Sequence, residues 1–430
     1  MPAPMNKSTK APAVYPRYTL ITHAKFIDPV SRTADDTDIL IVRERPGDVG
    51  RIVAMEQGLK PAVSPLTRVR GSGLYACRSF VDLHAHVGEP FEMHKEDIST
   101  ATAAAAAGGY GDILALPTAP SHWKDHETVD YLHSNAAAKG KIALHAAAYL
   151  TMGNRGEEPA DFERLVPRGT AAFFDEGAAS PALLYTAMER LAKLGALLIY
   201  RPDIPSLSQK GDKRSALAAA SLALSAALTA AALTGCRLHV TCVSSRMEIE
   251  LIRDARRRGV SVTCDTAPQY FTLTAIDLFY HGSLAKVTPP LQSTDDREAI
   301  IEAIADGTID CIVSDHTPEN AADKQKPLAE APSGIVGLQT TFALGMRELV
   351  QTGRIDLYRL IELLTTAPAR ILGLPPRLAP DLPAHLILLD IHREYTLTEG
   401  TLCSKSKNCP WLKHSFQGVI KRNFAKVSEK

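Results

Sequence analysis

Short apolar runs alternate with longer alanine-rich segments through the middle of the chain, and this alternation predicts the fold. The apolar runs have the length and composition of strands buried on both faces. They are Phe80–His86, Asp112–Pro117, Ile142–Tyr149, Ala171–Phe174, Ala196–Tyr200, Arg237–Val243, Ser261–Thr266 and Ile309–Ser314. Helical patterns fill most gaps, as in Ile98–Ala107, Pro181–Lys193, Arg246–Arg257 and Arg297–Ala305. This order predicts an α/β fold, namely a (β/α)8 barrel of the TIM type. The main alternative, a doubly wound open sheet, would need fewer strands or an extra domain.

The two ends of the chain show a different pattern. The run Ile39–Val42 is β-like and is followed by the turn residues Pro46–Asp48. After the barrel region and a proline-rich passage, His385–Asp390 returns to strand character. We therefore predict a disordered tail over residues 1–17, a small composite β-sandwich from residues 18–76 and 378–430, and a barrel over residues 77–377.

Composition narrows the class of protein. The 430 residues are 45% hydrophobic and 22% charged, with 48 basic and 48 acidic residues. Because the net charge is zero, there is no excess of basic residues that would indicate nucleic acid or an anionic membrane as a partner. Seven cysteines without a paired CxxC spacing favour a reducing compartment, and no signal-peptide core is seen, so we expect a cytoplasmic protein. The most apolar stretch, Ala216–Thr234, is mostly alanine and is expected to be a barrel helix rather than a membrane span.

Functional residues of such a barrel lie where its strands end. In the first predicted strand, the two-residue alternation of side chains puts His84 and His86 on one face. Two imidazoles aimed at one point are a good start for a divalent metal site, whereas two surface or packing histidines are the alternative.

Two carboxylates follow other strands. Asp315 comes directly after the buried run that ends at Ser314, so it is a candidate metal ligand and a candidate general base; the alternative is a strand-end cap or an ion pair. Asp175 follows the fourth strand and could bridge a second metal, or could be a turn carboxylate before Gly177.

Several motifs, in order along most of the chain, resemble the dihydroorotases of the amidohydrolase superfamily. They are Val81–His86, Glu89-Pro90, His94–Asp97, Ser314–Pro318, Ala331–Leu338 and Ser404–Pro410. The resemblance implies a barrel with a composite β-sandwich, a zinc site and reversible cyclisation of carbamoyl-aspartate to dihydroorotate. It assigns His84, His86 and Asp175 as metal ligands, and Asp315 as both ligand and catalytic proton shuttle.

The same resemblance exposes departures. Arg201 stands where the family has a fifth-strand histidine ligand, and a guanidinium cannot ligate a cation. It could instead fill the site, pairing with Asp175 or Asp315. Cys242 replaces the sixth-strand histidine ligand; it could bind zinc as thiolate or be a small buried hydrophobe. His239 matches another position and is expected to be structural.

The groups that the family uses to hold its anionic substrate are also exchanged. Gly88 stands in place of an arginine that would grip a carboxylate bidentately. The other exchanged positions are Thr118, Thr288, Gln292, Gln269-Tyr270 and Glu319.

Three functions remain open. The first is a non-catalytic dihydroorotase homologue that assembles with aspartate transcarbamoylase as a scaffold. The second is an active dihydroorotase with a mononuclear zinc site built on His84, His86 and Asp315. The third is a hydrolase of another, uncharged cyclic amide. We expect one zinc ion or none, rather than two, and a homo-oligomer. The loop from Glu319 to Pro332 is expected beside the site, as a lid or a binding surface.

Overall fold

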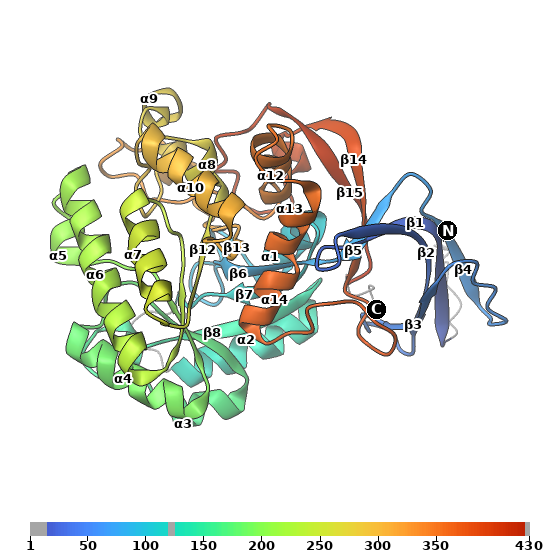
Figure 1. Cartoon of the computed structure of the whole chain (residues 1–430), viewed down its shortest axis with the longest axis horizontal. Coiled ribbons are helices and arrows are strands. Elements are labelled where there is room, and N and C mark those ends of the chain that lie inside the picture. The colour runs from blue at the N-terminus through green and yellow to red at the C-terminus, as the bar shows by residue number, and fades with distance from the viewer. Residues whose placement is uncertain (1–14, 119–124, 426–430) are drawn as a thin grey trace, which may run out of the picture.

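The computed structural model describes residues 15–118 and 125–425, and it divides into a large barrel and a smaller sheet lying beside it (Figure 1). The eight barrel strands form one parallel sheet in the order β13-β12-β11-β10-β9-β8-β7-β6. A parallel bridge between Ala85 and His316 joins the first strand to the segment after the last, so the sheet closes on itself. The predicted (β/α)8 barrel is confirmed.

The strand bounds follow the predicted runs. They are β6 Phe80–Ala85, β7 Tyr110–Ala115, β8 Ala143–Tyr149, β9 Thr170–Asp175, β10 Leu197–Tyr200, β11 Arg237–Val240, β12 Val262–Thr266 and β13 Cys311–Ile312. The last strand is shorter than the predicted run at both ends, and beyond its C-terminal end the Asp82 side chain bonds the chain. The Oδ1 atom of Asp82 accepts a hydrogen bond from the Ser314 backbone at 2.9 Å.

The helices of the barrel also match the sequence pattern. They are α1 Ile98–Ala107, α2 Asp125–Lys139, α3 Phe162–Leu165, α4 Pro181–Leu194, α5 Pro205–Ser208, α6 Lys213–Thr234, α7 Arg246–Arg257, α8 Pro268–Thr272, α9 Asp277–His281, α10 Thr294–Asp306, α11 Ala321–Lys324, α12 Thr341–Gly345, α13 Leu357–Leu364 and α14 Thr366–Leu372. Helix α10 begins three residues before the predicted Arg297 because Ser293 caps it, accepting a hydrogen bond from the Asp296 backbone.

Helix α6 contains the apolar stretch noted in the sequence. By length and composition it is the one helix in the described ranges that could cross a membrane, yet half of its apolar window is buried inside the protein. Its buried residues include Leu224 and Leu228, and it packs against α4 and α7. The helix therefore has the surroundings of a barrel helix, as expected.

Both chain ends build the second unit. Its strands are β1 Arg17–Asp28, β2 Thr33–Arg43, β3 Arg51–Glu56, β4 Leu66–Arg70, β5 Tyr75–Arg78, β14 Leu386–Thr396 and β15 Ser415–Asn423. They form one sheet in the order β15-β14-β5-β1-β2-β3, with β4 paired to β1, so C-terminal strands lie directly beside N-terminal ones. Strand β1 begins at the last residue of the predicted tail, and residues 1–14 lie outside the described part.

Candidate active site

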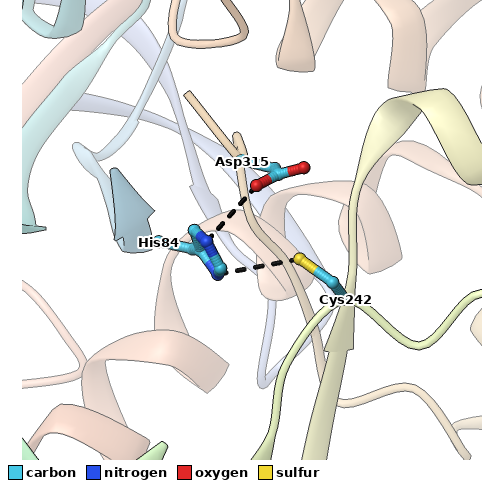
Figure 2. A group of neighbouring side chains, drawn as sticks. All are labelled: His84, Cys242 and Asp315. Atoms are coloured by element: carbon cyan, nitrogen blue, oxygen red, sulfur yellow. Dashed lines mark hydrogen bonds and ion pairs between the residues drawn. The ribbon is translucent and has the colours of Figure 1, made fainter. Parts of the chain in front are cut away.

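Three side chains from three different barrel strands meet at the mouth of the barrel. The ring nitrogen Nε2 of His84 lies 3.3 Å from Oδ1 of Asp315, and Nδ1 lies 3.6 Å from Sγ of Cys242 (Figure 2). The ligand atoms of these residues all lie within 4.8 Å of one another. The sequence pointed to each of them separately; the fold brings them together.

Backbone bends after the strands aim two of these side chains inward. Asp315 has φ +46° and Cys242 has φ +58°, a left-handed conformation that is uncommon for residues other than glycine. Hydrogen bonds hold the bends. The backbone N–H of Cys242 donates to Asp265 at 2.7 Å, and the Gln269 side chain donates to Asp315 at 2.5 Å.

Burial disfavours the charged form of each side chain in this group. Burial raises the pKa of Asp315 to about 7, against the opposing effect of the Arg201 charge and the Gln269 hydrogen bond. Burial also raises the pKa of the Cys242 thiol well above its usual value and lowers the pKa of His84 well below its own. The thiol therefore remains protonated and the imidazole neutral at physiological pH.

The other two predicted ligands are not part of this three-residue group. His86 follows the end of β6, where its backbone N–H donates to the His316 carbonyl at 2.8 Å. Its ring centroid lies 5.7 Å from that of His84, and it lines the cavity beside the group, so its role as a metal ligand stays a prediction. Asp175 accepts hydrogen bonds from the backbone of Gly177 at 3.0 Å and Ala179 at 3.3 Å. This is the arrangement of the turn carboxylate that the sequence left open, and its role as a metal ligand stays a prediction.

The Arg201 guanidinium has a different partner from the two carboxylates that the sequence suggested. It pairs with Glu176, and it also donates to the Thr288 carbonyl at 3.3 Å, rather than bonding Asp175 or Asp315. Its charge nevertheless acts on the mouth of the barrel, because it lowers the pKa of Asp315 against the larger effect of burial. The sequence analysis did not identify Glu176. An acidic residue directly after a strand end, near an arginine that replaces a metal ligand, could have indicated it.

A cavity of about 250 Å³ opens beside this group. It is lined by His86, Gly88, Glu92, Lys95, Pro117, Thr118, Tyr149, Glu176, Thr317, Pro318 and Glu319. The Lys95 ammonium is 2.7 Å from Glu92 and 3.1 Å from Glu319. The cavity is therefore rich in carboxylates, and its lysine is already paired.

The loop that follows Glu319 begins at the cavity, which Glu319 itself lines. It contains the short helix α11, and the ammonium of its buried Lys324 donates to the carbonyls of Pro332 and Gly334, both at 3.0 Å. These bonds tie α11 to the C-terminal end of the loop. Whether the loop acts as a lid or as a binding surface stays open.

A second buried group lies deeper in the barrel and contains His239, Asp265 and Cys311. Both ring nitrogens of His239 are engaged, Nδ1 with Thr263 at 2.8 Å and Nε2 with Asp265 at 2.9 Å. An imidazole bonded at both nitrogens has no lone pair to offer a metal, so these contacts support the expected structural role of His239.

The residues at the mouth do not fit a zinc ion as they stand. Imidazole, thiolate and carboxylate are suitable ligands by chemistry. However, both ring nitrogens of His84 already have partners: Nε2 faces Asp315 at 3.3 Å (Figure 2), and Nδ1 lies 2.8 Å from the Thr241 hydroxyl. A metal ion would have to displace one of these contacts. The raised pKa of Cys242 disfavours the thiolate that a metal needs, and burial is its main cause. We therefore derive no chemical step through a metal.

Comparison with known proteins assigns the chain to a family. The amidohydrolase family model matches residues 76–424. The dihydroorotase of Deinococcus radiodurans is 34% identical over 363 residues, which cover 81% of this chain and 87% of the relative. The dihydroorotase of Trichlorobacter lovleyi is 31% identical over 415 residues, covering 93% and 96%.

Solved structures agree on the fold. The dihydropyrimidinase of Brevibacillus agri NCHU1002 superposes with a TM-score of 0.83, covering 96% of this chain and 95% of that one, at 20% identity. The L-hydantoinase of Arthrobacter aurescens also gives a TM-score of 0.83, at 21% identity, covering 96% of each chain. At such identity the likeness concerns the fold alone. The chain belongs to the amidohydrolase family, and by sequence it is a relative of the dihydroorotases.

Proposed function

We propose that this protein is a non-catalytic dihydroorotase homologue of pyrimidine biosynthesis that acts in the cytoplasm as a structural partner of aspartate transcarbamoylase. The observation that carries the proposal is the pairing of the cations around the mouth of the barrel. Lys95 is held between Glu92 and Glu319, and Arg201 is paired with Glu176.

These ion pairs bear directly on substrate binding. Carbamoyl-aspartate and dihydroorotate are anions, and a carboxylate is gripped best by a free guanidinium. Position 88, where the family resemblance calls for an arginine, is Gly88, and the cavity instead presents Glu92, Glu176 and Glu319. A carboxylate entering here would meet like charges, which disfavour binding.

The metal site supports the same conclusion. His84, Cys242 and Asp315 form a group in which burial disfavours charge, and a permanent positive charge lies close by on Arg201. A dication brought to this place would have to deprotonate the thiol, displace the contacts of His84 and tolerate the guanidinium. Each of these requirements lowers the affinity for zinc.

A retained fold with an altered site is the pattern expected of a protein kept for assembly. The barrel is complete, and the departures fall on several separate strand ends. A scaffold needs its surface and its stability but no turnover. The seven cysteines are all free, in keeping with a reducing compartment.

Metal analysis and turnover test the first half of the proposal. The purified full-length protein, loaded with equimolar zinc and desalted, should retain well under one zinc per chain by mass spectrometry. It should not convert dihydroorotate. The matched variant Arg201→His/Cys242→His removes the guanidinium and supplies two imidazoles, and it should retain more zinc than the natural chain.

One result would replace the proposal with the mononuclear enzyme. Stoichiometric zinc in the natural chain, lost in His84→Ala and accompanied by turnover of dihydroorotate, would show that the site works as it stands. Zinc with turnover of an uncharged cyclic amide alone would favour the third function.

Assembly tests the second half. Mixed with aspartate transcarbamoylase from the same organism, the protein should elute as a larger complex in size-exclusion chromatography with light scattering. Run alone, it should give its own oligomeric mass, which we expect to exceed that of the monomer. A protein that elutes separately from the transcarbamoylase at micromolar concentrations would refute the scaffold role.

A further inference from the structure

A second cavity lies away from the mouth of the barrel, where the terminal hairpin of β14 and β15 packs against helices α1 and α12 (Figure 1). Its volume is about 360 Å³, within the range of small-molecule sites. Phe342, Ala343, Leu397 and Ile420 supply apolar walls. None of its lining residues belongs to the candidate active site.

A β-bulge explains why this cavity exists. Asp390 pairs with Val419 and Glu394 pairs with Gln417, so three residues of β14 oppose the single residue Gly418. Such a bulge bends its strand and redirects the side chains within it. Gly418 has φ +103°, and a Cβ there would come within 2.9 Å of the Phe342 ring. The hairpin therefore bends over α12 at this glycine.

The bulge places Arg393 at the cavity, and Lys421 reaches it from β15. Both are exposed, and neither side chain has an ion pair or hydrogen bond to any described residue. The residues that line the cavity include no aspartate or glutamate. This is the opposite of the mouth of the barrel, where carboxylates neutralise the cations.

Two unpaired cations above apolar walls define a type of ligand. An anionic group can bind the guanidinium and the ammonium, while an apolar body is removed from water against Phe342 and Leu397. Tyr395 lines the same cavity and adds an aromatic ring. An anion without an apolar body would gain nothing from the walls, and a neutral apolar molecule would gain nothing from the cations.

We propose that this cavity, between the β14–β15 hairpin and helices α1 and α12, is a binding site for a small amphipathic anion, a phosphate or carboxylate carried on an apolar or aromatic body. The site is independent of the proposed scaffold function. Because it joins the terminal sheet to the barrel, a bound ligand stabilises the contact between the two units.

Isothermal titration calorimetry of the full-length protein with 1-naphthyl phosphate tests the site. We expect saturable binding with one ligand per chain, weakened when salt is raised from about 50 to 300 mM. The neutral analogue 1-naphthol should bind more weakly. Arg393→Gln/Lys421→Gln should raise the Kd about fivefold, the effect of losing partly exposed charge contacts.

Two further variants separate this site from general attraction of anions. Arg422→Gln removes the same charge from the next residue of β15, whose side chain does not line the cavity, and it should leave the Kd unchanged. Ala107→Phe adds bulk at an exposed lining position of α1 without changing charge, and it should abolish binding. Circular dichroism verifies that each variant is folded.

The proposal fails if the natural chain shows no saturable binding of 1-naphthyl phosphate. It also fails if Arg393→Gln/Lys421→Gln binds as tightly as the natural chain, or no more weakly than Arg422→Gln. If Ala107→Phe is misfolded, the charge variants decide the result, because they change exposed side chains, and those of Arg393 and Lys421 make no hydrogen bond or ion pair to the described residues.

Discussion

Asp112 offers a sharp test of how the barrel is joined to the segment that leads into the terminal sheet. Its carboxylate, from β7, lies 3.2 Å from Arg78, 3.1 Å from His145 and 2.9 Å from His385. Both partners of the Asp112–Arg78 pair are buried, with 4% and 7% of their side chains exposed. The perturbation is Asp112→Asn, which keeps the shape and removes the charge.

The expected cost follows from what remains around Arg78. Breaking a buried ion pair costs about 3–5 kcal/mol because it leaves an uncompensated charge. Arg78 keeps hydrogen bonds to the carbonyls of Pro375 at 2.9 Å and Ser79 at 2.8 Å. These bonds partly compensate its charge, so we expect a loss of about 3 kcal/mol, the lower end of that range.

Urea unfolding at pH 7, followed by far-ultraviolet circular dichroism, measures the loss. Glu163→Gln is the matched control, since it removes a carboxylate from the Arg190 pair, in which 34% and 57% of the side chains are exposed. That change should cost at most about 1 kcal/mol. If Asp112→Asn costs no more than Glu163→Gln, the reasoning from burial is wrong.

The pH dependence gives an independent check. Burial alone would raise the pKa of Asp112, but His145, His385 and Arg78 together hold it below its ordinary value. A carboxyl whose pKa is lowered by folding contributes stability that is complete above its unfolded pKa, about 3.9. That contribution is lost as the pH falls through the folded pKa. The difference between the natural chain and Asp112→Asn should therefore be full at pH 7 and should narrow below about pH 4.

Three further predictions concern stability. Gly108→Ala should cost about 3 kcal/mol, since the new Cβ would lie 1.9 Å from the Leu338 carbonyl oxygen, whereas Gly195→Ala faces open space and should cost about 1 kcal/mol, both by urea unfolding. Ser180→Ala removes the cap of α4 and should cost about 1 kcal/mol; an unchanged unfolding midpoint would refute the capping role. Burial raises the pKa of Asp82 to about 7, so the neutral acid contributes stability that is lost as pH rises from about 4 to 7. The free energy of unfolding of Asp82→Asn should therefore rise relative to that of the natural chain between about pH 4.5 and about pH 8. A difference between the two free energies that stays constant with pH would contradict this.

The order of strands and helices could be predicted from the sequence because it depends on neighbours a few residues apart. An apolar run marks a strand buried on both faces, and a capping residue marks where a helix begins. Helices α1 and α7 have the predicted bounds for this reason. The same local logic identified His84 and Asp315, since a histidine or carboxylate at the end of a buried strand needs a partner.

Which of these side chains lie together in the site depends on the tertiary structure. Simple alternation predicts that His86 lies beside His84, and their ring centroids are 5.7 Å apart, although β6 ends at Ala85. The sequence did not show that His86 also lines the cavity, or that the bend at Cys242 brings the thiol to His84.

Charge pairing could not be read from the sequence either. Arg201 and Glu176 are 25 residues apart, and Arg78 and His385 meet at Asp112 from opposite ends of the chain. The sequence by itself determined which elements form and which side chains end them. Only the closed barrel decided which of those side chains meet, because the bends after each strand and the register between strands depend on contacts between segments far apart in the chain.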